Sequence, residues 1–172
     1  VPDRPGIVAQ IFAAVGAASF IGWATSTNEP ASASTDTAST TSTTSNAPAI
    51  AWTIVKGEAD GPAKVKEALA NAKKACKPAM IDFFAEWCIA CKELDKKTYV
   101  DDAVRKDAQR FATIKVDSTK DSAALKSLLD EFKVGGLPRV LFVDGTGKLL
   151  DDPSVEGFVE PADYLKSMKR VR

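Results

Sequence analysis

The sequence predicts an α/β domain built on one mixed sheet with helices on both faces. First, the run from Met80 to Phe84 is almost continuously apolar, as in a central strand that is buried on both sides. Second, segments with helical apolar periodicity, such as residues 62–75 and 122–133, alternate with strand-like segments. Third, the element order is βαβα followed by βαββα, without an internal repeat, which favours this layered architecture.

The first 24 residues are predicted to form a membrane-spanning helix. Gly6 to Ala24 carries no charged side chain, and at ~1.5 Å per residue such a helix just crosses a ~30 Å hydrocarbon core. Arg4 precedes the run and no Lys or Arg follows before Lys56, so the N-terminal end is expected in the cytoplasm and the rest outside. A signal peptide or a buried soluble helix are the alternatives. Because the first residue is Val1, we expect a processed chain or a piece of a longer one.

Residues 25–48 are expected to be a flexible linker. Ser, Thr and Ala dominate this segment, and large apolar side chains are almost absent. Such a composition cannot bury enough surface to offset the entropy lost on ordering. The linker would therefore let a globular domain at residues 49–172 reach more than one partner.

The globular part is predicted element by element. Pro78 and the pair Gly135-Gly136 end two helices, and Asp144 to Gly147 forms a tight hairpin turn. The expected strands are 50–55, 79–85, 111–117, 139–143 and an edge strand that begins at 148–150; the expected helices are 62–75, 92–99, 122–133 and 161–169.

Composition narrows the chemistry of this domain. The 23 acidic and 23 basic side chains give a formal net charge of zero, so no overall field favours nucleic acid or an anionic membrane. The chain has no histidine, which excludes Cys-His pairs, Ser-His-Asp triads and histidine-containing metal sites. Three cysteines are too few for a four-thiolate zinc site. We therefore expect neither a metal nor a bound cofactor, and a redox role for the closely spaced cysteine pair.

Cys88 and Cys91 are the candidate catalytic pair. They are three residues apart, after a strand and at the start of a helix, where the helix dipole and free backbone N-H groups lower the pKa of a thiol. Cys88 is the expected nucleophile, and the more buried Cys91 is expected to resolve the mixed disulfide. A static disulfide or two ordinary buried cysteines is the alternative. Cys76, just before a strand, is expected to be a buried spectator, with a reactive surface thiol as the alternative.

Two acids and one loop are expected beside this pair. Asp82 interrupts the apolar central strand, so we expect a buried carboxyl with a raised pKa that exchanges a proton with Cys91, or else a solvent-facing strand residue. Asp95 lies one helical turn after Cys91 and is a second candidate acid, or an ordinary exposed one. Leu137-Pro138 precedes a strand, and local sequence leaves open a plain turn or a cis bond that faces the dithiol.

These residues carry a family resemblance. Trp87-Cys88-Ile89-Ala90-Cys91-Lys92 after a strand with Asp82, followed by Gly136-Leu137-Pro138, resembles the thioredoxin superfamily. Lys77 to Asp82, Ala85 to Leu94, Thr98-Tyr99, Leu141-Phe142 and Asp144-Gly145 make the residues from about Ile50 to Arg172 similar to the C-terminal periplasmic domain of DsbD-type thiol:disulfide interchange proteins.

The resemblance implies a thioredoxin-like fold and a membrane-tethered domain in the bacterial periplasm. It implies electron transfer from a transmembrane domain, through Cys88 and Cys91, to a periplasmic acceptor domain that serves misoxidised proteins or cytochrome c biogenesis. Asp82 and Asp95 would modulate the dithiol, and Pro138 would be the cis-proline. Trp87, Ile89, Ala90, Leu137 and Pro138 would form the substrate groove.

Other interpretations stay open at this point. The domain is expected to be monomeric and to act on protein disulfides or dithiols as a protein-disulfide reductase. The alternatives are a stand-alone, membrane-anchored thioredoxin-like protein that serves as a cytochrome-maturation reductant or as an oxidant, and a non-catalytic peptide- or copper-binding module.

Overall fold

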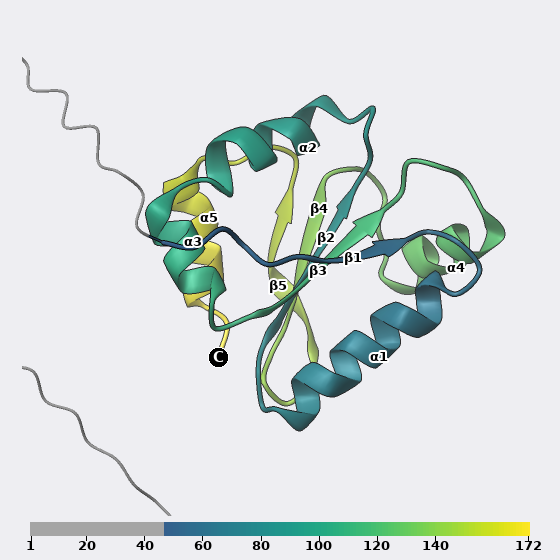
Figure 1. Ribbon diagram of the computed structural model, residues 1–172, viewed down its shortest axis with the longest axis horizontal. Helices are drawn as coiled ribbons and strands as arrows, with labels where there is room; N and C mark the ends of the chain where they lie inside the picture. Colours follow the sequence, from purple (N-terminus) through teal and green to yellow (C-terminus); the bar gives the residue numbers. More distant parts are fainter. Residues whose placement is uncertain (1–46) are drawn as a thin grey trace, which may run out of the picture. The chain divides into compact units, whose positions relative to one another are not determined.

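The computed structural model describes residues 47–172 (Figure 1). The predicted membrane helix at residues 6–24 and almost all of the predicted linker at residues 25–48 lie outside these residues. Within residues 47–172, every helix is too short or too polar to cross a membrane.

Five strands form one mixed sheet in the order β1-β3-β2-β4-β5. Strands β1, β3 and β2 run parallel, whereas β4 is antiparallel to β2 and β5 is antiparallel to β4. The central strand is β2, and five of its six residues are buried, as its apolar sequence predicts. The strands are β1 (Thr53–Lys56), β2 (Ala79–Phe84), β3 (Ala112–Asp117), β4 (Arg139–Val143) and β5 (Leu149–Glu156).

Helices cover both faces of the sheet, which confirms the predicted layers (Figure 1). On one face lie α1 (Gly61–Lys74) and α4 (Ala123–Glu131). The other face is covered by η1 (Leu94–Thr98), which continues α2 (Ile89–Glu93), together with α3 (Asp102–Ala108) and α5 (Pro161–Lys169). The alternation of β2 divides its side chains between two apolar cores.

The two cores show where the functional face of the sheet lies. Ile81 and Phe83 pack under α1 and α4, whereas Met80 packs with Tyr164 and Leu94 on the opposite face. Fully burying a side chain of this size contributes about 1.5–3 kcal/mol. Because strand residues alternate, Asp82 shares the face of Met80, the face that carries the cysteine helix.

The cysteine helix differs from its predicted bounds, whereas the last strand begins within the predicted residues 148–150. The helix begins at Ile89, directly after Cys88, and its second half is a π-helix in which the Tyr99 N-H donates to the Leu94 carbonyl at 2.8 Å. Strand β5 extends through a cis Asp152-Pro153 bond, which an edge strand tolerates because its outer N-H groups have no ladder partner.

Helix α3 was missed, and the prediction for Cys76 was wrong. Only Val104 and Ala108 are buried on α3, which is too short an apolar stripe to identify from periodicity. Cys76 is exposed rather than buried. It follows the last turn of α1 with φ of 50°, in a left-handed turn that directs the chain into β2.

The Asp101 carboxylate should contribute measurably to stability as the N-cap of α3. Its Oδ1 accepts hydrogen bonds from the N-H groups of Ala103 and Val104 at 2.9 and 3.1 Å. We expect Asp101→Ala to lower the free energy of unfolding by about 1 kcal/mol, measured by urea denaturation. Asp60 is the matched control because it occupies the N-cap position of α1 without a capping hydrogen bond. An equal loss in Asp60→Ala would contradict the assignment.

Candidate active site

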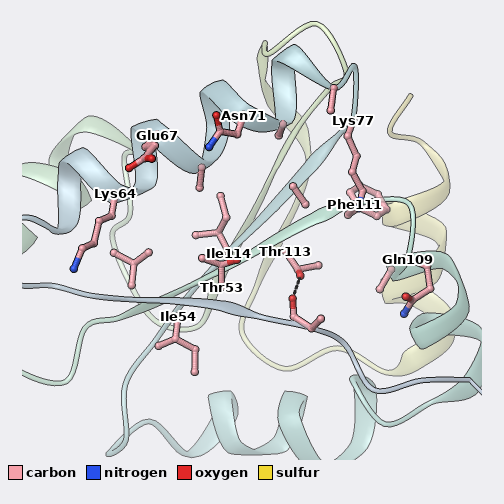
Figure 2. A pocket seen from close by; sticks show the side chains of 17 residues that line it. Thr53, Ile54, Lys64, Glu67, Asn71, Lys77, Gln109, Phe111, Thr113 and Ile114 are labelled. Carbon is pink, nitrogen blue, oxygen red and sulfur yellow. Dashed lines mark hydrogen bonds between the residues drawn. The ribbon is translucent and has the colours of Figure 1, made fainter. Parts of the chain in front are cut away.

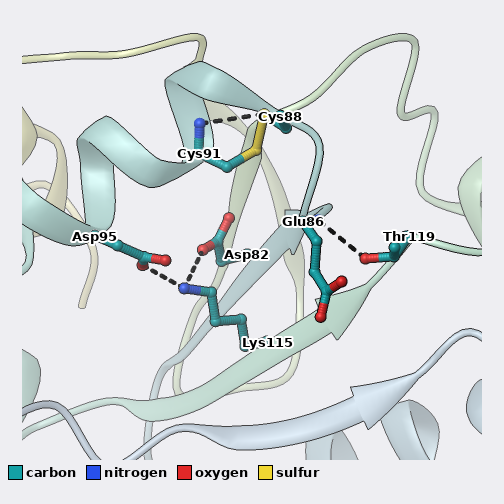
Figure 3. Close-up of a disulfide and its surroundings, with 7 residues drawn as sticks. All are labelled: Asp82, Glu86, Cys88, Cys91, Asp95, Lys115 and Thr119. Carbon is teal, nitrogen blue, oxygen red and sulfur yellow. Dashed lines mark hydrogen bonds and ion pairs between the residues drawn. A yellow bond between two sulfur atoms is a disulfide. The ribbon is translucent and has the colours of Figure 1, made fainter.

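The two cysteines meet where β2 ends and α2 begins (Figure 3). Cys88 is the N-cap of α2 with extended backbone angles, so its side chain faces the free N-H groups of the first turn. Its Sγ accepts a hydrogen bond from the Cys91 N-H at 3.1 Å. The two residues form a disulfide, with their Cα atoms 5.3 Å apart. The junction between β2 and α2 therefore holds the two cysteines close enough to form a disulfide.

The disulfide is buried, but the two residues that flank Cys88 in the sequence are exposed. Cys88 and Cys91 are 6% and 3% exposed, a small difference in the direction expected for a resolving Cys91. Trp87 and Ile89 beside them are 65% and 77% exposed. Two large apolar side chains are therefore open to contact with a partner directly beside the disulfide.

The predicted substrate groove is assembled from the start of α2, the residue Trp87 before it, and the loop before β4. Ala90 and Leu137 pack against the cysteines, which brings the loop before β4 next to the dithiol. The Leu137-Pro138 bond is cis, as the resemblance implies, and Pro138 is buried. Trp87 lies exposed at the edge of this groove. We call Trp87, Ile89, Ala90, Leu137 and Pro138 the docking surface.

Thr119, which the sequence did not single out, fixes the loop that carries Trp87. Its Oγ1 accepts the Glu86 N-H at 2.9 Å (Figure 3). Its carbonyl oxygen accepts the Trp87 indole N-H at 3.3 Å. These bonds join the loop after β3 to the loop after β2. Both loops follow parallel neighbouring strands and therefore lie at the same edge of the sheet. This contact depends on the strand order, which the local sequence does not show.

Asp82 is buried beneath the disulfide, and the prediction of a solvent-facing residue is excluded (Figure 3). It is 2% exposed. Burial raises the pKa of Asp82 from 3.8 to about 7, because desolvation disfavours the charged carboxylate. The Lys115 ammonium opposes this effect, and the Asp95 carboxylate adds to it. The carboxyl thus exchanges its proton near neutral pH.

Lys115 connects the two predicted acids. Its Nζ lies 3.7 Å from Asp82 Oδ2 and donates a hydrogen bond to Asp95 Oδ1. Lys115 is 7% exposed, whereas the Asp95 side chain is 42% exposed. The structure therefore brings Asp95 to the site through Lys115.

Three aromatic rings surround the Lys115 ammonium. Its Nζ lies 4.7 Å from the ring centre of Phe84 and 5.4 Å from those of Trp52 and Tyr99. Within about 6 Å, the negative faces of such rings attract a cation. These rings and the two acids compensate the burial of the ammonium group.

Sequence reasoning missed Lys115 although a signal for it existed. Ile114 and Val116 pack in the core beneath α1 and α4, so the alternation of strand residues places Lys115 on the other side of β3. That side is buried because helices cover both faces of the sheet. In the parallel pairing of β2 with β3, Lys115 is the register partner of Asp82. A buried acid beside a lysine on a neighbouring strand is the pattern that identifies this pair.

Two of the hollows on the surface of residues 47–172 differ in their relation to the dithiol. One is open to solvent and is lined by Phe84, Ala85, Glu86, Cys91, Lys92 and Asp95. The other, of about 700 Å³, lies between α1 and the edge strand β1 and has neither cysteine of the disulfide in its lining (Figure 2). Among the described residues, no group of three or more Cys, Asp and Glu side chains is arranged to hold a metal ion.

Comparison with known proteins agrees with this geometry. A family model described as a thioredoxin-like domain matches residues 65–172, more than half of the chain. The chain belongs to the thioredoxin-like family. The thiol:disulfide interchange protein DsbD of Vibrio vulnificus (strain CMCP6) is 37% identical over 108 residues, which cover 63% of this chain and 18% of that protein. The chain therefore matches less than a fifth of that relative's length.

Two solved structures of the same protein domain are also similar to this chain. The reduced form of the DsbD C-terminal domain of Neisseria meningitidis has a TM-score of 0.60 and 27% identity, covering 69% of this chain and all of that one. The oxidised form has a TM-score of 0.57 and 30% identity, covering 64% of this chain and 96% of that one. Together, the thioredoxin-like fold and these relatives support a thiol-disulfide oxidoreductase.

The raised pKa of Asp82 should make stability depend on pH. Between pH 3.8 and about 7, the folded chain retains a proton that the unfolded chain has released, so the free energy of unfolding falls as pH rises. Asp82→Asn lacks this titration. We expect its stability relative to the parent to improve from pH 4 to pH 8, by up to about 4 kcal/mol.

Urea denaturation of the disulfide form at several pH values measures this difference. Asp130→Asn is the control, because Asp130 is an exposed partner of Lys126 on the surface of α4. Equal pH dependence of the parent and Asp82→Asn would contradict a buried acid that titrates near neutrality.

Proposed function

We propose that this chain contains a protein-disulfide reductase domain that exchanges electrons with protein partners through Cys88 and Cys91. The arrangement that carries the proposal is a dithiol at a helix N-terminus above the buried acid Asp82. Its similarity to the C-terminal domain of DsbD supports the same chemistry.

The first step uses Cys88 as the nucleophile. In the reduced protein, the Cys88 thiolate attacks one sulfur of a partner disulfide, a new S-S bond forms, and the partner's other sulfur leaves as a thiolate. The Cys91 N-H, which donates to Cys88 Sγ in the disulfide, is positioned to stabilise this thiolate. Cys88 borders the docking surface, so an incoming disulfide reaches it first.

In the second step, Cys91 releases the partner. Its thiol gives its proton to the Asp82 carboxylate, and its sulfur attacks Cys88. The Cys88–Cys91 bond forms as the mixed disulfide breaks, and the partner leaves reduced. An acid with a pKa of about 7 suits this role because it accepts and returns a proton near neutral pH. Lys115, held by Asp95, stabilises the carboxylate before it accepts the proton.

The docking surface supplies the contacts with the partner. Trp87 and Ile89 present exposed apolar area, and Ala90 and Leu137 line the approach to the disulfide. Aromatic and aliphatic side chains of this kind anchor protein interfaces. We therefore propose a protein segment around a cysteine as the substrate, with the domain acting as a monomer.

We propose that the domain works as a relay in the bacterial periplasm. Electrons would come from a transmembrane donor domain and pass to a periplasmic acceptor domain, which serves misoxidised proteins or cytochrome c biogenesis. Residues 6–24 would tether the domain to the membrane. The support for this placement is the similarity to DsbD and the uncharged N-terminal run.

Substitution of the cysteines tests the proposed chemistry. We expect Cys88→Ser to abolish reduction of insulin disulfides, followed by turbidity with dithiothreitol as electron source, because the attacking thiolate is lost. Cys91→Ser should accumulate a mixed disulfide with the substrate, which a non-reducing gel would detect. Cys76→Ser is the control and should retain parental activity. Full activity in Cys88→Ser would exclude the mechanism.

A further inference from the structure

Two buried polar atoms in the network around Asp82 lack a hydrogen-bond partner. Lys115 Nζ faces Asp82 Oδ2, which leaves Oδ1 without one within residues 47–172. In the same part of the chain, the Tyr99 hydroxyl is also buried without a partner of ordinary geometry. A buried polar atom without a partner is costly, so two of them near one charged group call for an explanation.

Tyr99 is placed to reach Asp82. It follows η1, is 5% exposed, and its ring centre lies 5.4 Å from the Lys115 ammonium that contacts Asp82. Its ring also packs 5.1 Å from Trp52 and 5.4 Å from Tyr164. A phenylalanine would make the same ring contacts, so packing alone does not explain the hydroxyl.

The neighbouring hydroxyl of Tyr164 is already used. Tyr164 donates to Met80 Sδ at 2.8 Å, so it is no donor for Asp82. The groups that face Asp82 are Lys115 from β3, Asp95 from η1, Tyr99 after η1 and Tyr164 from α5, with the disulfide of α2 above them. The Tyr99 hydroxyl also interacts with Tyr164, but it has no hydrogen bond of ordinary geometry to any group of this set.

We infer that Tyr99 is a positioning residue for Asp82, whose hydroxyl is the hydrogen-bond partner of Oδ1 in both protonation states of the acid. When Asp82 is ionised, the Tyr99 O-H donates to the carboxylate. When Asp82 has taken the proton of Cys91, the carboxylic O-H donates to the Tyr99 oxygen. A phenol can do both because it is donor and acceptor. The inference rests on the proton-accepting role proposed above for Asp82.

The electrostatics of the site agree with this arrangement. Burial raises the pKa of Tyr99 well above its usual value of 10, so the hydroxyl stays neutral throughout the pH range of thiol exchange. The Tyr99 hydroxyl lowers the pKa of Asp82, in the sense expected of a donor to a carboxylate. Without it, Asp82 should hold its proton to higher pH and be a weaker acceptor at neutrality.

The test isolates the step in which Cys91 attacks. The reduced full chain, in a Cys76→Ser background, is mixed with 5,5′-dithiobis(2-nitrobenzoate) in a stopped-flow instrument. Attack by Cys88 releases one thionitrobenzoate, and attack by Cys91 on the resulting mixed disulfide releases the second. The second release is recorded as a function of pH for the parent chain, Tyr99→Phe and Tyr164→Phe.

We expect Tyr99→Phe to slow the second release about threefold or more at pH 7 and to move the midpoint of its pH profile upward, with parental rates regained at high pH. Tyr164→Phe should follow the parent profile. A Tyr99→Phe profile that matches the parent, or that is lowered equally at every pH as after a structural defect, would overturn the inference.

Two further measurements separate the possible failures. Asp82→Asn should lose the pH transition of the second release. If Asp82→Asn keeps the parent profile, the proposed acid role of Asp82 is wrong. If Asp82→Asn changes the profile and Tyr99→Phe does not, only the inference about Tyr99 is wrong. In the unsubstituted chain, NMR should show a slowly exchanging Tyr99 hydroxyl proton whose shift follows the titration of the Asp82 carboxyl. A hydroxyl proton that ignores this titration would also overturn the inference.

Discussion

Asp82 sits in the central strand of the sheet, where its surroundings exclude water almost completely, and the cost of that burial explains much of the site. Taking an ionised carboxylate out of water costs several kcal/mol unless a charge and hydrogen bonds compensate it. Lys115 supplies the compensating charge from the neighbouring strand. The balance leaves Asp82 with a pKa of about 7, where an acid both accepts and returns a proton.

The burial of Lys115 has to be compensated in turn. Its ammonium is held by Asp95 and by the faces of Phe84, Trp52 and Tyr99. Asp95 is the partly exposed member of the network and borders the open hollow next to Cys91. A chain of charged groups thus runs from the buried acid to the surface, with the dithiol above it. The sheet positions Asp82 and Lys115, and η1, which continues the cysteine helix, positions Asp95.

Local sequence was sufficient for the parts of the site that depend on one element. The apolar run of β2, the cysteine pair after it and the isolated Asp82 all lie within a dozen residues, so the strand, the dithiol and the buried acid could be predicted. Lys115 and Thr119 could not, because their roles depend on which strands are neighbours and in which register. Helix α3 was missed because its stripe is two residues long, and Cys76 because a left-handed turn exposes it.

The claim that this domain donates electrons is tested most directly by the reduction potential of the Cys88–Cys91 pair. The full chain, in a Cys76→Ser background, would be equilibrated with glutathione redox buffers, and the fraction of disulfide measured by thiol alkylation. A reductase of the proposed kind should have a potential more negative than about −200 mV. A potential near about −120 mV, typical of strong protein oxidants, would contradict the account.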